Sequence, residues 1–169
     1  TSLNNTGDSN ITRSTLTDEN NVGLGYDTIS AVTFSGSANT AVGSNTLRAL
    51  VDKNFNTGVG FRAGYATTGE CNTFIGNQAG QTNVAGNNNV IIGSIADTSS
   101  ITAVNQVVIG QNANGHDDHI VVIGNNLCEA WHPDNNGGVD LGSSSYKFKN
   151  LYLSDISCTN INATLDDVT

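Results

Sequence analysis

Apolar and polar residues alternate in short runs that return along most of the chain. Each clear run begins with Asn, continues with two Thr or apolar residues around one small or apolar residue, and ends with Gly, as at 39–43, 56–60, 72–76 and 89–93. Weaker copies span 22–25, 107–110 and 121–124. A period of about 17 residues indicates a stack of repeated units. The closing glycines are Gly25, Gly43, Gly60, Gly76, Gly93, Gly110 and Gly124.

Each run predicts a short β-strand followed by a glycine corner. Alternate residues of a strand share a face, so the first and third positions, such as Thr40 and Val42, are expected to face inward. The glycine permits a bend or a positive φ. Small residues recur three positions later and fit the second wall of a narrow coil. Each unit is therefore predicted to contain a strand, a glycine corner, a second short strand and a turn. The small residues are Thr28, Thr46, Ala63, Ala79, Ala96 and Ala113.

The residue between the two inward positions is expected to point outward. It is small in the early runs and apolar in the later ones, which contain Phe74, Ile91, Val108 and Val122. Exposed, these four would form a larger apolar ladder than soluble monomers usually carry, so we expect another chain to cover them. A cyclic trimer is the simplest closed assembly of parallel rods, although the ladder alone also permits a dimer.

Together these patterns predict an all-β fold. The expected architecture is a parallel β-roll or β-solenoid of about seven coils, assembled as an intertwined homotrimeric fibre. The low content of charged residues, 12% against ~25% in ordinary domains, removes most of the strong helix formers. We therefore expect almost no helix.

Charge and hydropathy exclude two classes of partner. The net charge is −9 with only six Lys and Arg, whereas binding to nucleic acid needs clustered basic residues. No apolar run reaches the ~18 residues that span a bilayer. We expect neither nucleic-acid binding nor membrane insertion.

The sequence offers few groups for catalysis or metal binding. His116 and His119 lie in the one cluster of potential metal ligands, which is predicted to be a solvated turn, with a metal or pH-sensitive site as the alternative. Cys71, Cys128 and Cys158 cannot all pair within one chain, and buried or semi-buried thiols are favoured over an interchain disulfide. We see no Gly-x-Ser-x-Gly motif and no paired carboxylates at inward positions. The chain is predicted to be no enzyme and to need no cofactor.

An aligned array of threonines suggests an ice-binding solenoid as a minor alternative. Thr40, Thr57 and Thr73 occupy the same phase of the repeat, but the column continues with valines. Because this column is expected to face inward, the ice-binding interpretation is disfavoured.

Two stretches resemble known fibre proteins. The Asn-Thr-Ala-Val-Gly repeat over residues 21–124 is similar to the heads of trimeric autotransporter adhesins, and to repeats in bacteriophage tail fibres and in fibre-like proteins of large algal viruses. Residues 139–153, which contain LGSSSYKFKNLYL, resemble a segment that lies upstream of a self-cleaving chaperone in viral fibres. The resemblance implies a homotrimer on the virion surface, with the bacterial cell surface as the alternative.

This resemblance divides the chain into three parts. Residues 1–20 are predicted to connect to an upstream shaft, residues 21–126 to form the solenoid, and residues 127–169 to cap it and form a C-terminal β region before a removed chaperone.

The expected function is attachment of a viral fibre to a host-surface glycan or glycoprotein. Asn and Gln in the turns suit sugar hydroxyls, and exposed aromatic rings could stack on sugars. Neighbouring fibre or virion proteins are the other expected partners. A non-binding structural spacer and the head of a bacterial trimeric adhesin are the alternatives. The candidate ligand contacts, each of which also has a structural interpretation, are Tyr26, Phe61, Tyr65 and Trp131.

Overall fold

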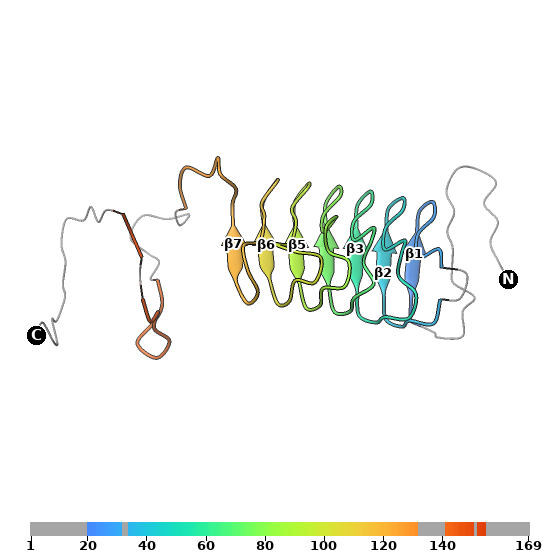
Figure 1. Ribbon diagram of the computed structural model, residues 1–169, viewed down its shortest axis with the longest axis horizontal. Helices are drawn as coiled ribbons and strands as arrows, with labels where there is room; N and C mark the ends of the chain where they lie inside the picture. Colours follow the sequence, from blue (N-terminus) through green and yellow to red (C-terminus); the bar gives the residue numbers. More distant parts are fainter. Residues whose placement is uncertain (1–19, 32–33, 132–140, 151, 155–169) are drawn as a thin grey trace, which may run out of the picture. The chain divides into compact units, whose positions relative to one another are not determined.

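The computed structural model describes residues 20–31, 34–131, 141–150 and 152–154. Seven three-residue strands form one parallel sheet in sequence order, so the chain winds through about six turns of a β-solenoid (Figure 1). The predicted solenoid is confirmed, and the described residues contain no helix. The strands are β1 (Val22–Leu24), β2 (Thr40–Val42), β3 (Thr57–Val59), β4 (Thr73–Ile75), β5 (Val90–Ile92), β6 (Val107–Ile109) and β7 (Val121–Ile123).

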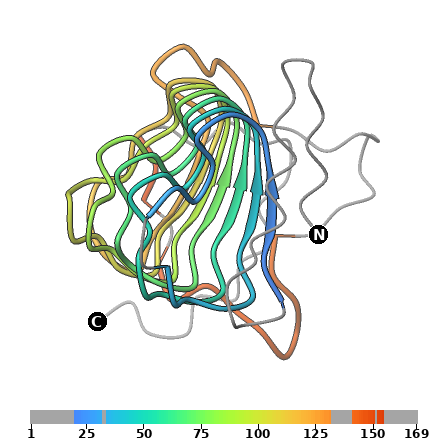
Figure 2. The same ribbon diagram turned by 90° about the vertical axis from the view of Figure 1, so that its right-hand side faces the viewer.

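Equivalent positions of the repeat stack directly on one another. Thr40 pairs with Thr57, which pairs with Thr73, and this register holds along the whole sheet. Figure 2 looks along the stack and shows the sheet on one side, with the connecting loops on the other. The predicted second strand of each unit is absent from the described loops, which contain only the isolated bridges Asn87–Val104 and Asp97–Asn114.

The predicted orientation of the strands was wrong. The middle residues point into the coil, where Ala41, Phe74, Ile91 and Val108 are fully buried. The first and third residues point outward, and Ile75, for example, remains 38% exposed. A period of two separates the faces of a strand but does not say which face the chain encloses. The later ladder that was expected to need a second chain is therefore covered within this one, except Val122, which is partly buried.

Complementary side-chain volumes fill the narrow core. The Phe74 ring lies between Gly64 and Gly80: a Cβ on Gly64 would come within 2.5 Å of the ring, and one on Gly80 would overlap it. Where the strand residue is Gly58, the opposite wall supplies Leu47, whose Cγ would be 3.0 Å from a Cβ on Gly58. Because protein interiors are close-packed, small strand residues of the early coils face large loop residues, and large strand residues of the later coils face small ones.

A ladder of buried amides runs beside this core and was not anticipated from the sequence. The Asn that opens each run faces inward, and its Oδ1 accepts the backbone N–H of the equivalent residue in the next coil. Its Nδ2 donates to a turn carbonyl of the next coil, as from Asn72 to the oxygen of Gly86 at 2.8 Å. Buried polar groups need such partners, so each amide joins two successive coils. The ladder consists of Asn39, Asn56, Asn72 and Asn89, and Gln106 continues it.

The predicted glycine corners are confirmed. Six of the seven closing glycines have φ between 129° and 137°, and Gly124 has 93°. A Cβ on Gly60 would lie 2.5 Å from the carbonyl oxygen of Gly76 in the next coil. The corner therefore needs glycine both for its dihedral angles and for the spacing of the coils. The small residues three positions later are buried, as predicted.

The chain divides into two compact units, residues 1–129 and 130–169. The solenoid belongs to the first unit. In the second, the N–H of Ser143 donates to the oxygen of Tyr146 at 2.8 Å, and the N–H of Tyr146 donates to Ser143 Oγ at 3.0 Å, which closes a turn. The predicted connector up to residue 19, residues 132–140 of the predicted cap, and Cys158 lie outside the described residues.

Candidate functional site

The outward residues of the seven strands form one continuous surface, here called the outer sheet face. It consists of the first and third residue of each strand, and 11 of these 14 residues are Val, Leu or Ile. Val59 is 37% exposed at its centre, and Val121 is 66% exposed at its end. Parallel sheets are usually covered on both faces, so this surface is suited to contact with another molecule.

The three aligned threonines also lie on the outer sheet face. Thr40, Thr57 and Thr73 point outward, contrary to the prediction, and are partly buried. The same column continues with valines in the four other strands. Hydroxyl groups therefore occupy only a part of the surface.

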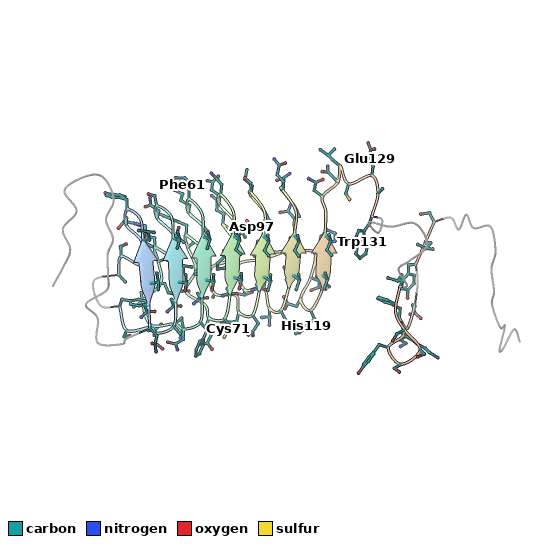
Figure 3. The ribbon with its side chains drawn as sticks, turned by 180° about the vertical axis from the view of Figure 1, so that it is seen from behind. Phe61, Cys71, Asp97, His119, Glu129 and Trp131 are labelled. Carbon is teal, nitrogen blue, oxygen red and sulfur yellow. The ribbon has the colours of Figure 1, made fainter. Side chains whose placement is uncertain are left out.

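A second surface feature lies at the corner that follows the C-terminal ends of the strands. We call it the corner cluster, and it consists of Asp27, Arg48, Phe61, Arg62 and Tyr65. Arg48 Nε donates to Asp27 Oδ2, and Arg48 Nη1 donates to the hydroxyl of Tyr65 at 3.2 Å. Phe61 projects from this corner of the solenoid (Figure 3).

Three cation–π contacts hold the corner cluster together. The guanidinium carbon of Arg62 is 5.2 Å from the ring centroid of Phe61 and 5.3 Å from that of Tyr65. The guanidinium carbon of Arg48 is 5.6 Å from the Tyr65 centroid. These distances are within the range in which an aromatic face attracts a cation. Tyr65 is thus in contact with both arginines.

Only one of the two arginines in the corner cluster is paired with a carboxylate. The hydrogen bond from Arg48, and a second one from Ser30, lower the pKa of Asp27 below its ordinary value of 3.8. The same contact with Asp27 raises the pKa of Arg48. Among the described residues of the solenoid unit, Arg48 and Lys53 have acidic partners, whereas Arg62 makes no ion pair. The positive charge of Arg62 is therefore available.

Stacking of the coils brings these residues together. Arg48 and Tyr65 each follow a corner glycine by five residues, and Asp27 and Arg62 each follow one by two. The sequence analysis named only the rings as candidate contacts and gave the arginines no role. Equal distances in sequence from the corner glycines are the signal that could have placed these residues on one corner.

The other candidate contacts make no contact of this kind with the cluster. Tyr26 precedes Asp27 in the first coil and is 66% exposed, but no ring or ion-pair contact joins its side chain to the cluster. Trp131 is 79% exposed and belongs to the second unit.

The two histidines occupy different surroundings. His119 Nδ1 lies 3.1 Å from the side-chain amide nitrogen of Asn105. His116 lines a hollow of about 560 Å³ at the end of the stack, with Asn112, Asn114, Val122 and other residues. Within the described part of the chain, no three His, Cys, Asp or Glu side chains are grouped as metal ligands. In Figure 3, His119 and Cys71 lie at the corner opposite Phe61.

The carboxylate of Asp97 has a structural partner in the loops. Both carboxylate oxygens of Asp97 accept the N–H of Thr82, at 3.0 and 2.9 Å. Cys71 and Cys128 form no disulfide within the described residues, and both are exposed, whereas the sequence favoured buried or semi-buried thiols. Along the described residues no helix is suited to cross a membrane.

Comparisons with models of protein families, with curated proteins and with solved structures found no match to this chain.

Proposed function

We propose that this chain is a segment of a viral attachment fibre. Three copies associate through the outer sheet face, and the exposed corners contact a glycan or glycoprotein on the host surface. The fibre belongs to the virion surface and adjoins other fibre or virion proteins. The observation that carries the proposal is the pairing of an apolar face along the solenoid with a separate exposed corner of aromatic and polar side chains.

The extent of the outer sheet face supports self-association. Six strand spacings of about 4.8 Å give it a length of roughly 29 Å, and apolar side chains continue along all of it. A contiguous apolar surface of this kind on a soluble protein marks an interaction site. A second copy of the chain has the same spacing between coils, so its outward side chains can align with this face over the full length.

This geometry, together with the resemblance to trimeric fibres, supports a trimer. A threefold axis along the stack brings equivalent coils of the three chains to the same height. In this trimer the other chains cover the outward Val, Ile and Thr residues of each chain. The sequence analysis had expected them to cover Phe74 and its neighbours, which lie in the core.

Light scattering during size-exclusion chromatography tests the assembly. The expected mass is three times the 17.5 kDa of one chain. A Val59→Lys/Ile75→Lys variant places two charges on the outer sheet face and should elute as a folded single chain, because both side chains already point outward. Asn77→Lys is the matched control, since Asn77 is exposed outside the sheet. A wild-type monomer, or a trimer that survives both outward lysines, would contradict the proposed interface.

A panel of immobilised glycans tests attachment. We expect the assembled wild-type protein to bind a reproducible subset of the glycans. Binding should also weaken in the lysine double variant, because loss of the trimer removes multivalency. Failure of the wild-type trimer to bind any glycan would leave the structural spacer as the better interpretation.

A further inference from the structure

We propose that the corner cluster binds a sugar that carries a carboxylate. Arg62 pairs with the carboxylate, and the exposed ring of Phe61 contacts the apolar face of the sugar. This inference rests on the proposed attachment function and names the chemical class of its ligand.

Arg62 has the charge and the geometry for a carboxylate. It makes no ion pair among the described residues of the solenoid unit, whereas Arg48 is paired with Asp27. Its guanidinium lies against the rings of Phe61 and Tyr65. Stacking uses the flat face of a guanidinium and leaves N–H groups at its edge for a two-point hydrogen bond to a carboxylate.

The solenoid holds this part of the corner in place. The N–H of Arg62 donates to the oxygen of Ser44 at 2.9 Å, and the oxygen of Phe61 accepts the N–H of Gln78 at 2.8 Å. Arg62 has a φ of 56°, and the equivalent Asn45 and Asn112 have 59° and 53°. The positive φ is thus a property of the repeat. A ligand at this corner meets side chains on a backbone that is already ordered, which lowers the entropic cost of binding.

The neighbouring side chains supply contacts for a sugar. Phe61 is 44% exposed, and the C–H groups of a pyranose form an apolar surface that can cover such a ring. The Tyr65 hydroxyl accepts a hydrogen bond from Arg48 and keeps its own hydrogen for donation. The amide of Asn77, in the next coil and at the same phase as Phe61, is exposed for hydroxyl groups.

The overall charge favours a small acidic ligand over a polyanion. The chain has a net charge of −9, which repels nucleic acid and densely charged polymers. One arginine beside two rings can still bind a single carboxylate, because exposed charges that lie farther away than the ~8 Å screening length at physiological salt are largely screened. A sugar acid combines this one charge with an apolar face and hydroxyl groups.

Binding to a defined glycan panel tests the inference. The probes are oligosaccharides ending in glucuronic acid, galacturonic acid or N-acetylneuraminic acid, each beside its carboxyl-reduced form and a sulfated hexose. We expect the wild-type trimer to bind at least one acidic probe and to lose that binding on carboxyl reduction or at high salt.

Substitutions locate the site. Arg62→Asn should weaken binding about 10- to 100-fold, the range for loss of a charge-assisted contact. Arg62→Lys should weaken it less, because the charge remains. Asn is found at the equivalent position in two other coils, so Arg62→Asn should keep the wild-type melting temperature. Ile95→Asn is the matched control: Ile95 has a φ of 58° two coils away, and its substitution should leave binding unchanged.

Three results would overturn the inference. Binding of the carboxyl-reduced or sulfated probes in preference to the acidic ones, or acidic binding that Arg62→Asn leaves unchanged, would overturn the ligand assignment while attachment to glycans stands. Binding of no probe and no other glycan by the wild-type trimer would overturn both the ligand assignment and the glycan-attachment function.

Discussion

Replacing Asn72 by Ala would break the amide ladder in the middle of the solenoid. Asn72 is fully buried. Its Nδ2 donates to the oxygen of Gly86 at 2.8 Å, and its Oδ1 accepts the backbone N–H of Asn89 at 3.0 Å. Alanine removes both side-chain atoms and leaves the carbonyl of Gly86 and the N–H of Asn89 without these partners.

The expected cost follows from the two groups that become unsatisfied. A buried donor or acceptor that loses its partner costs about 1–3 kcal/mol. Two such groups give an expected loss of about 2–6 kcal/mol in the free energy of unfolding. Other contacts limit the loss, because Asn56 Oδ1 still accepts the N–H of residue 72, and Asn89 Nδ2 still donates to the oxygen of Ala103 at 2.7 Å.

Denaturant unfolding, followed by circular dichroism, measures this effect. Wild type and variant are compared at one protein concentration, because self-association adds to apparent stability. Hydrogen exchange provides a local readout, since the Asn89 amide should lose protection in the variant.

Asn77→Ala is the matched control for this experiment. Asn77 is exposed, and its side chain has no hydrogen-bond partner in the described structure, so the change should stay within about 0.5 kcal/mol. If Asn72→Ala were no more destabilising than Asn77→Ala, or left exchange at Asn89 unchanged, the amide ladder would not stabilise the stack as argued.

Three further predictions concern the corner, the core and the ion pair. Gly60→Ala should destabilise the fold by about 3 kcal/mol or more, because its φ is 129° and the new Cβ would meet the oxygen of Gly76; an unchanged melting temperature would refute this. Phe74→Ala should cost about 3–5 kcal/mol by opening a cavity, which urea unfolding would measure, and a loss below 1 kcal/mol would mean that the core collapses around it. Because the folded-state pKa of Asp27 is lowered, its contact with Arg48 should stabilise the fold above pH 3.8 and be lost as the pH falls through the lower folded value. NMR titration of the Asp27 carboxyl carbon should give a midpoint below 3.8 that rises in Arg48→Gln, and a midpoint unaffected by that substitution would contradict the pairing.

The repeat in the sequence was sufficient to predict the parallel solenoid, its strand positions and its corners. Nearly equal spacing of Gly43, Gly60 and Gly76 requires nearly equal path lengths between successive strands, and stacked coils satisfy this with in-register pairing. The trimer stays a prediction, and its expected interface has moved to the outward residues. The prediction of a second strand in each unit was wrong, because residues with positive φ, such as Arg62 and Gln78, interrupt the extended backbone after six of the seven corner glycines.

The sequence by itself determined which residues stack, whereas only the tertiary structure decided which of them are enclosed. A strand such as Thr73–Ile75 is apolar on both faces, and its alternation is the same whichever face the loop covers. The loop covers Phe74 because Gly64 and Gly80 leave room for the ring, and because the inward Asn72 binds a turn of the next coil. Likewise, Arg48, Arg62 and Tyr65 form one surface only because the coils place their phases side by side. Such contacts depend on the volume and path of the whole coil, which no short window of sequence specifies.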